Sequence, residues 1–387
     1  MQRINIGVTF VVASVALTFA QTSSPKDVDL VAPDGVKLRA TVFAAPKPGP
    51  GVILLHMCNT TRKSWEPVAR ELSEKGINAL TIDNRGFGES GGPRFEGASA
   101  DVRQQLAEKW AGDFDAAYQY FVSQPGVDRS RLGVGGGSCG VDNAVKLAQR
   151  HPDEKVLVLL AGTTSVDGFN FVSRRTEMPI FTAAAADDEF NSATLQVMQW
   201  FSEISANPRT KFVGFQNGRH GTEIFGPHPE LVHDIVAFLV DTLVTSPAGA
   251  QVTPRTTPAY DFWMLANQPG GGAKAAETFH EARKRDPKEM LFPELPINLL
   301  GYDRLQAGDN DDAIQLFKLN VEAYPASANA EDSLSDAYLA TGQKEQALAA
   351  EKKCLELLPG DPNSADFKAQ LKQHADEKIA QLQAGKK

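Results

Sequence analysis

Residues 133–142 read GVGGGSCGVD, and the turn that this stretch predicts decides the fold. Gly136, Ser138 and Gly140 satisfy the pattern G-x-S-x-G. The apolar segment RLGVGGG before the serine has the pattern of a buried strand, and VDNAVKLAQRH after it has the pattern of an amphipathic helix. A serine between such elements lies on a tight turn, where bulk two residues away would clash with neighbouring backbone. The stretch therefore predicts an exposed nucleophile between a strand and a helix.

An acid and a histidine follow the serine at the ends of two later strands. The segment PIFTAAAADDEF places Asp187 and Asp188 directly after an apolar strand, and FQNGRHG places His220 after the last strand. In this order, the three residues resemble the catalytic triad of the α/β-hydrolase fold, and the resemblance covers residues 26–243. It implies that Ser138 is the nucleophile and that His220 is the general base and acid. Asp188 matches the family's usual position for the acid, and Asp187 is the alternative.

The resemblance also implies an oxyanion hole made of two backbone N–H groups. One belongs to Cys139, the residue after the nucleophile. The other comes from the loop HMCNTT after the third strand, at Met57 or Cys58. The usual His-Gly at this strand end is His56-Met57 here, which leaves the second donor open between the two residues. His56 itself is expected to pack or to orient this loop.

Cys139 is the rival nucleophile, because dienelactone hydrolases of the same fold carry a cysteine at this turn. A register on Cys139 places Val141 where the second glycine belongs, whereas the register on Ser138 supplies both glycines, so the sequence favours the serine. Cys139 is then either a small side chain at the helix start or the partner of Cys58 in a disulfide. Both cysteines flank the predicted oxyanion hole, and the sequence leaves this pairing open.

Strand and helix patterns alternate between residues 26 and 243. KDVDLVA and VKLRATVFA predict a hairpin, and later strands such as GVILLH and KVLVLLA are apolar on both faces. The prediction is an α/β class domain, a mostly parallel eight-stranded sheet with helices on both faces. Only about sixteen residues separate the strand ending at Ala161 from the one starting near Met178. This short segment leaves no room for a cap and predicts an open site.

The chain changes character after residue 243. VTSPAGAQVTPRTTP (244–258) is rich in proline, threonine, serine and glycine and predicts a linker. Residues 259–387 then carry a period of 34, in which Gly308 pairs with Gly342 and Pro325 with Pro359. Helix–turn–helix units of this length resemble the tetratricopeptide repeat. We therefore expect an all-α domain of helical repeats that binds a protein or peptide or packs on its neighbour.

The first twenty residues and the net charge of the chain indicate where the protein is located and which partners it lacks. Residues 1–20 combine Arg3 with an uncharged apolar run that closes on small residues. They predict a signal peptide and export to the periplasm or the extracellular space, with no stable membrane span after cleavage. A net charge of −9 argues against a nucleic-acid partner. The chain has no H-E-x-x-H motif, and its G-x-G-x-x-G matches lack the context of a dinucleotide site, so we expect neither a metal nor a cofactor.

Together these residues predict an exported serine hydrolase that cleaves carboxyl esters or related acyl bonds of a small molecule through an acyl-enzyme intermediate. A dienelactone hydrolase-like enzyme with Cys139 as nucleophile and a serine peptidase are alternatives. A different alternative is a catalytically silent protein that works through its helical repeats. Basic residues in the loops at the strand ends add one further expectation, an anionic substrate: Arg62, Lys63, Arg85, Arg94, Arg174, Arg175 and Arg219.

Overall fold

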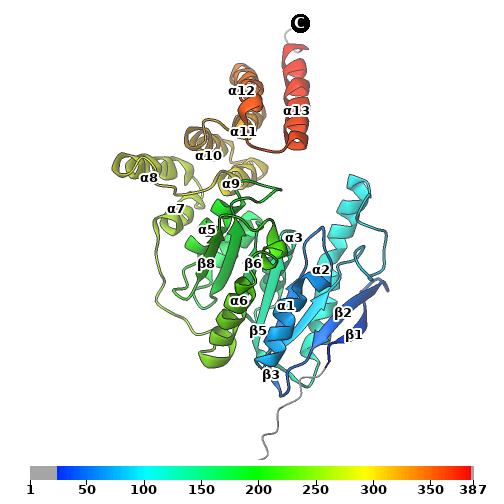
Figure 1. Cartoon of the computed structure of the whole chain (residues 1–387). Helices are drawn as coiled ribbons and strands as arrows, with labels where there is room; N and C mark the ends of the chain where they lie inside the picture. Colours follow the sequence, from blue (N-terminus) through cyan, green and yellow to red (C-terminus); the bar gives the residue numbers. More distant parts are fainter. Residues whose placement is uncertain (1–23, 385–387) are drawn as a thin grey trace, which may run out of the picture.

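The computed structural model describes residues 24–384 of the chain. The signal peptide predicted at residues 1–20 lies outside this range and stays a prediction. The first part of the described chain, which we call the sheet domain, is built on one eight-stranded sheet with the order β1-β2-β4-β3-β5-β6-β7-β8 (Figure 1). The strands are β1 (Lys26–Val31), β2 (Lys37–Phe43), β3 (Gly49–Leu55), β4 (Asn78–Ile82), β5 (Val127–Gly137), β6 (Glu154–Leu160), β7 (Ile180–Ala185) and β8 (Lys211–Phe215).

The sheet is parallel except at one edge. β1 and β2 form an antiparallel hairpin, and β2 also runs antiparallel to β4, whereas every pairing from β4 to β8 is parallel. Along β6, Leu157 and Leu159 face one hydrophobic core, and Val156 and Val158 face the other. A central strand that buries both faces needs helices on both sides. The predicted hairpin and the mostly parallel eight-stranded sheet are confirmed.

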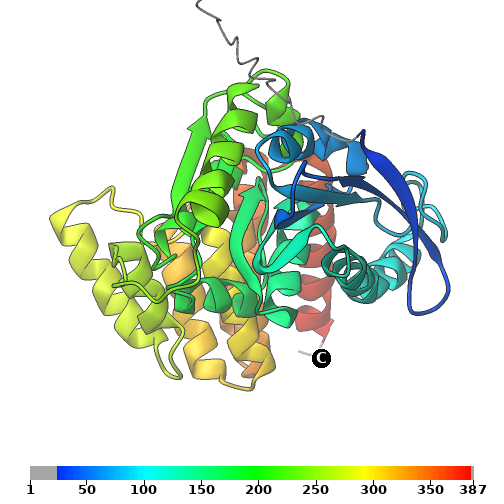
Figure 2. The same ribbon diagram turned by 90° about the horizontal axis from the view of Figure 1, so that it is seen from below.

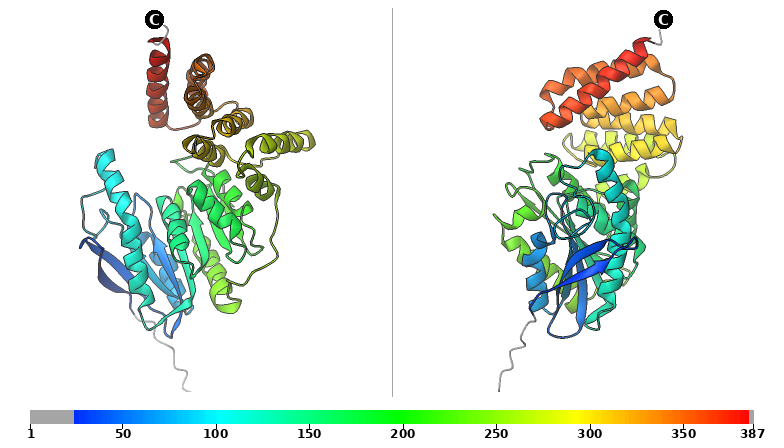
Figure 3. Two further views of the ribbon diagram at one scale, coloured as in Figure 1. Left: turned by 180° about the vertical axis from the view of Figure 1, so that it is seen from behind. Right: turned by 90° about the vertical axis from the view of Figure 1, so that its right-hand side faces the viewer.

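Helices cover the two faces of this sheet (Figure 3). Apolar side chains of α1 and α6 fill the core on one face, and those of α2, α3, α4 and α5 fill the core on the other. The parallel strands therefore end, at their carboxyl ends, in loops that lead into these helices, where sheets of this kind place their sites. The bounds are α1 (Glu66–Glu74), α2 (Ala100–Val122), α3 (Cys139–Arg150), α4 (Val166–Arg174), α5 (Thr194–Glu203) and α6 (Glu230–Val240).

A second domain, the helical domain, follows in the described residues 258–384. It consists of α7 (Pro258–Ala266), α8 (Gly272–Arg285), α9 (Glu294–Gln306), α10 (Asn310–Ala323), α11 (Ala328–Ala340), α12 (Lys344–Leu357) and α13 (Ala365–Ala384). Both ends of α11 and α12 lie 34 residues after the corresponding ends of α9 and α10. The helices thus follow the period that the sequence carries, and the assignment to the tetratricopeptide class stays a prediction. Within residues 24–384, no helix is both long and apolar enough to cross a membrane.

The two domains share one hydrophobic core. Residues 246–257, which connect them, contain no helix or strand, yet the elements on either side of this connection pack together. Trp263 of α7 meets Phe169 of α4 and Trp200 of α5 edge to face, with ring centroids 5.7 and 5.3 Å away. The indole N–H of Trp200 donates to the carbonyl oxygen of Leu291 at 3.0 Å. The helical domain is therefore docked against the sheet domain rather than tethered to it (Figures 1 and 2).

Candidate active site

Ser138 lies on the turn between β5 and α3, with a positive φ of 52° and a ψ of −121°. Two glycines permit this turn. A Cβ on Gly136 would lie 1.9 Å from the carbonyl oxygen of Gly140, and a Cβ on Gly140 would lie 2.6 Å from the carbonyl oxygen of Leu55. A non-glycine residue with positive φ is strained and persists only where its surroundings hold it. The two positions where a Cβ would clash with backbone, Gly136 and Gly140, lie two residues before and two residues after Ser138. This turn therefore fits the serine register and not a register on Cys139.

The histidine and one of the two aspartates form a close pair. Nδ1 of His220 lies 2.6 Å from Oδ2 of Asp188, and the carboxylate of Asp188 is buried. The other carboxylate oxygen of Asp188 accepts the backbone N–H groups of Phe190 and Asn191 at 2.9 and 3.2 Å. These bonds fix the carboxylate in the loop after β7, so that it can orient the imidazole ring.

Asp187, the alternative acid, has a different partner. Its Oδ1 accepts the backbone N–H of Arg219 at 3.0 Å, one residue before the histidine. Arg219 has a positive φ of 64°. This hydrogen bond therefore ties the loop after β8 to the loop after β7, while Asp188 alone of the two acids reaches the imidazole ring.

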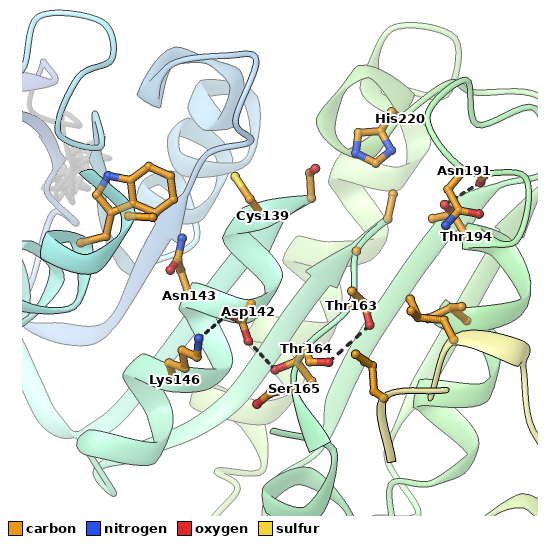
Figure 4. Close-up of a pocket in the computed structure, with 18 residues that line it drawn as sticks. Cys139, Asp142, Asn143, Lys146, Thr163, Thr164, Ser165, Asn191, Thr194 and His220 are labelled. Atoms are coloured by element: carbon orange, nitrogen blue, oxygen red, sulfur yellow. Dashed lines mark hydrogen bonds and ion pairs between the residues drawn. The ribbon is translucent and has the colours of Figure 1, made fainter. Parts of the chain in front are cut away.

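Ser138 and His220 line one cavity of about 550 Å³ at the carboxyl ends of β5 and β6. Residues of α3 form one side, and His220, Asn191 and Thr194 lie on the other (Figure 4). Among the residues that the structure describes, the serine hydroxyl makes no hydrogen bond to the histidine ring. Such bonds are often long before substrate binds. The apolar part of the lining consists of Ala107, Trp110, Ala161, Val197, Leu295 and Leu299.

A disulfide joins Cys139 to Cys58, with 5.9 Å between the two Cα atoms. The bond connects the start of α3 to the loop after β3, and therefore settles the pairing that the sequence left open. Cys139 carries no free thiol in this state and cannot act as a nucleophile. Of the three predicted oxyanion residues, Cys139 lines the cavity with Ser138, whereas Met57 and Cys58 do not.

Met57 and His56 hold the loop after β3 in place. The sulfur of Met57 accepts the backbone N–H of Thr222 at 3.3 Å, beneath the loop that carries His220. The backbone N–H of Asn84 donates to Nε2 of His56 at 2.9 Å, so Nδ1 carries the proton and donates to the carbonyl oxygen of Met57 at 2.5 Å. Complete burial lowers the pKa of His56 to about 4, which keeps the ring neutral. His56 thus orients the loop, as the sequence predicts.

Four of the seven basic residues at the strand ends form ion pairs with carboxylates, namely Arg62, Arg85, Arg175 and Arg219. Arg62 pairs with Asp83 at 2.6 Å, and Arg85 pairs with Asp113 at 2.7 Å. Arg219 pairs with Glu189 and Glu223 at 3.3 and 3.1 Å. None of the seven basic residues named above is among the residues that line the cavity. The expectation of an anionic substrate therefore has no support in this site.

One group of described residues offers three metal-binding side chains at close range, namely Asp332, Glu351 and Cys354 in the helical domain. The ammonium of Lys378 already lies among them, 3.0 Å from a carboxylate oxygen of Asp332 and 3.0 Å from one of Glu351. A buried lysine that pairs with these carboxylates offsets part of their charge and takes the place that a cation would need. The prediction that the protein needs no metal stays a prediction.

Helix α9 contributes to the cavity, which the sequence alone did not predict. Leu295 and Leu299 line it from the helical domain. A signal was present in the repeat, because the positions 34 residues later are the polar Asn329 and Ser333. The next repeat unit packs with polar residues at these two positions. The leucines of α9 therefore indicate that this face of α9 contacts something other than a repeat unit. The open site expected from the short β6–β7 segment is therefore wrong on this side, because α9 covers it.

The match to known families agrees with this geometry. Residues 46–186 match the family model described as serine aminopeptidase, S33. The match includes Ser138 and ends just before Asp187. Together with the strand order and the strained serine after β5, it decides the fold of the sheet domain. This domain has the α/β-hydrolase fold.

Curated relatives of the α/β-hydrolase domain are fungal proteins. The thiohydrolase aneE of Aspergillus aculeatus is 32% identical over 124 residues, which is 32% of this chain and 36% of that protein. The polyketide transferase grgF of a Penicillium species is 31% identical over 170 residues, 43% of this chain and 54% of that protein. The chain thus matches between about a third and just over half of the length of these two relatives.

Solved structures match the same domain. The esterase Pf2001 of Pyrococcus furiosus is 20% identical with a TM-score of 0.46, and the match covers 60% of this chain and 97% of that one. The esterase Est1E of Butyrivibrio proteoclasticus, solved with ferulic acid bound, is 20% identical with a TM-score of 0.46, covering 55% of this chain and 98% of that one. Both matches cover less than two thirds of the present chain.

Proposed function

We propose that the chain is a serine hydrolase that cleaves ester or thioester bonds of a small molecule through Ser138, His220 and Asp188. One observation carries the proposal: a strained serine and a histidine, held by a buried carboxylate at 2.6 Å, line the same cavity. A nucleophile, a base and a group that orients the base are the three parts that acyl transfer needs.

The chemistry follows from these positions. Oγ of Ser138 attacks the carbonyl carbon of the substrate while its proton passes to Nε2 of His220, and Asp188 stabilises the imidazolium through the Nδ1–H bond. The tetrahedral intermediate collapses when the bond to the leaving group breaks and His220 returns the proton to that group. A water molecule then attacks the acyl-enzyme in the same way, with His220 as base, and releases the carboxylic acid and the free serine.

The negative charge that forms on the carbonyl oxygen needs two donors. The backbone N–H of Cys139 opens α3 directly after the nucleophile and supplies the first. We assign the second to Cys58, because the disulfide keeps this residue beside Cys139. Met57 stays the alternative donor, and its sulfur accepts the backbone N–H of Thr222.

The lining of the cavity argues against the peptidase alternative. An aminopeptidase has to bind the positive amino terminus of its substrate, which calls for an unpaired carboxylate. Asp142 is the acidic residue of the lining, and its carboxylate pairs with Lys146 at 2.7 Å and accepts the hydroxyl of Thr164 at 2.8 Å. Because the Asp142 carboxylate already pairs with Lys146, it would bind the positive amino terminus of a peptide only weakly.

A second candidate function is acyl transfer to an acceptor other than water. The names of the relatives favour it, since grgF is a polyketide transferase and drtE of Aspergillus calidoustus, 26% identical over 197 residues, is an acyltransferase. The same acyl-enzyme serves both reactions, and they differ only in the nucleophile of the second step. Partition of an acylated enzyme between water and an added alcohol, amine or thiol distinguishes them.

We further propose that the protein is exported and that its helical repeats, of the tetratricopeptide type, also present a surface to a protein or peptide. The disulfide between Cys58 and Cys139 supports export, because such bonds persist in oxidising compartments. The silent alternative, in which only the repeats work, conflicts with the complete set of Ser138, His220 and Asp188. Binding of a peptide library to residues 256–387 within the full chain tests the repeat surface.

Labelling with a fluorophosphonate tests the serine assignment. We expect the wild-type protein to form an adduct on Ser138, located by mass spectrometry, and Ser138→Ala to form none. Thr163→Val is the matched control, because Thr163 lines the same cavity and carries a hydroxyl outside the proposed machinery.

Three further outcomes bear on the assignment. Cys139→Ala should still be labelled on Ser138, since the sulfur takes no part in the attack. An adduct on Cys139 under reducing conditions, together with an unlabelled serine, would replace the proposal by the cysteine-nucleophile alternative. Absence of any adduct would move attention to the helical domain.

A further inference from the structure

We propose that α9 of the helical domain forms the acyl-binding wall of the hydrolase site and selects uncharged, apolar acyl groups. This inference rests on the proposed function, because it names the class of substrate for the same cavity. Leu295 and Leu299 carry it, since both line the cavity that contains Ser138 and His220. They are four residues apart on one helix, so their side chains lie on one face, one turn above the other.

The sequence of the helical domain singles out these two leucines. α11 lies in the position of α9 in the next repeat unit and carries Asn329 and Ser333 at the corresponding places. The leucines that the repeat fold itself uses are different, for example Leu300, which corresponds to the buried Leu334. Leu295 and Leu299 are half-buried because one side of each borders the cavity. Leu299 also packs at the edge of the shared core, and the side of both leucines that stays outside the core borders the cavity.

The wall is fixed in place by the shared core. The backbone carbonyl of Leu291, just before α9, accepts the indole N–H of Trp200 at 3.0 Å, and Phe292 stacks on Phe262 with ring centroids 4.8 Å apart. Arg304 at the other end of α9 donates to the backbone carbonyl of Asn267 at 2.7 Å. A helix that is held at both ends and packed in a core presents a constant surface to a ligand.

The remaining lining carries no net charge to attract a charged acyl group. Val197 of α5 adds to the apolar lining, and the α3 residues Asn143 and Lys146 form one side of the cavity (Figure 4). Lys146 and Asp142 on α3 pair with each other at 2.7 Å. A neutral, largely apolar cavity favours an apolar ligand with a few polar atoms. During the first step the leaving group departs, whereas the acyl group stays bonded to Ser138, so a fixed wall suits the group that stays.

The test compares leucines on two faces of α9. For Leu295→Asn, Leu299→Asn and wild type, kcat/KM is measured with p-nitrophenyl acetate and p-nitrophenyl octanoate. We expect the octanoate-to-acetate ratio to fall about tenfold in each variant, because burial of a leucine-sized contact is worth roughly that factor. Leu305→Asn is the matched control, since Leu305 lies on the same helix and packs against the core of the repeats. Its ratio should stay at the wild-type value.

A binding measurement separates failure of this inference from failure of the proposed function. Calorimetric titration of octanamide into Ser138→Ala needs no turnover, and we expect Leu299→Asn in that background to weaken binding about tenfold relative to Ser138→Ala alone. An unchanged ratio and unchanged octanamide affinity would overturn the role of α9 even if Ser138 is labelled. Tight octanamide binding that depends on Leu299, without labelling of Ser138, would retain the wall and overturn the hydrolase mechanism.

Discussion

Asp187 and Asp188 are adjacent in the sequence but act on different groups, a backbone N–H and an imidazole ring. We expect Asp188→Asn to lower kcat for an ester substrate by about 10³–10⁴, because an amide neither stabilises the imidazolium nor holds the required tautomer. Asp187→Asn keeps an oxygen that accepts the N–H of Arg219 and should retain most of the activity. Steady-state kinetics on the two variants distinguishes the roles, and equal losses would contradict this assignment.

The disulfide between Cys58 and Cys139 should contribute to the stability of the folded protein. It closes a loop with a sequence separation of 81 residues. The double variant Cys58→Ala/Cys139→Ala should therefore have a free energy of unfolding about 2–4 kcal/mol lower than the wild type, mainly because its unfolded chain is less constrained. Urea denaturation measures this, and reduction of the wild type should give the same loss. Reduction of Cys58→Ala/Cys139→Ala itself should change nothing.

Glu154 begins β6 with a carboxyl group that is buried and has no hydrogen-bond partner. Burial raises its pKa to about 8, Asp153 adds to the shift, and Lys155 opposes it. The unfolded chain loses this proton near pH 4.5. The stability that comes from the protonated form is therefore complete below about pH 4.5 and is lost as the pH rises to about 8.

Glu154→Gln removes this titration while keeping the shape of the side chain. We expect the variant to gain stability over the wild type between pH 4.5 and pH 8, by up to a few kcal/mol at the upper end. Urea unfolding at several pH values measures the difference. An advantage that does not change with pH would show that Glu154 is not protonated in the folded protein.

At the residue scale, chain order explains where the predicted site residues lie, while their catalytic roles stay a prediction. Ser138 directly follows β5, and Asp188 and His220 lie in the loops that follow β7 and β8. Parallel strands bring their carboxyl ends to one edge of the sheet, so these three residues come close together. The disulfide could not be decided in this way, because bonding of Cys58 to Cys139 depends on a distance that spacing does not contain.

At the scale of elements, the β5–α3 turn depends on two glycines that face each other across it. Gly140→Ala places a methyl group 2.6 Å from the carbonyl oxygen of Leu55, where rigid backbone cannot yield. We expect a loss of about 1–3 kcal/mol in the free energy of unfolding. Gly137→Ala is the control, because its methyl group would meet the flexible side chain of Met57 at 3.1 Å. Thermal denaturation compares the two, and an equal cost would contradict the packing argument.

Helix α9 shows what element patterns miss. The helix itself and its place in a period of 34 are visible in the sequence, because each repeat unit is a local structure. The cavity that it borders is lined by residues 107–220, far earlier in the chain, and no periodicity records such a contact. The departure of Leu295 and Leu299 from the next unit indicates a partner without naming it.

For the whole molecule, the shared core predicts that α7, α8 and α9 unfold together with the sheet. Trp263→Ala should lower the free energy of unfolding by about 3–5 kcal/mol, because it empties a fully buried site between Phe169 and Trp200. In the wild-type protein, amide hydrogen exchange measured by mass spectrometry should show that β6 and α9 lose their protection at the same urea concentration. Loss in α9 well before β6 would mean that the two domains are thermodynamically independent.

The docking of α9 also limits how the molecule can be divided or recombined. A fragment that stops after the sheet keeps Ser138, Asp188 and His220 but loses Leu295 and Leu299, so it would be an enzyme with a different preference and an exposed apolar face. Conversely, changing the cavity-facing side chains of α9 should alter which substrates are accepted without changing any reacting group. The connection at residues 246–257 is itself tied to the sheet domain, since the backbone N–H of Arg255 donates to the carbonyl oxygen of Ala206 at 2.7 Å, and that of Gly249 donates to the carbonyl oxygen of Glu177 at 3.2 Å.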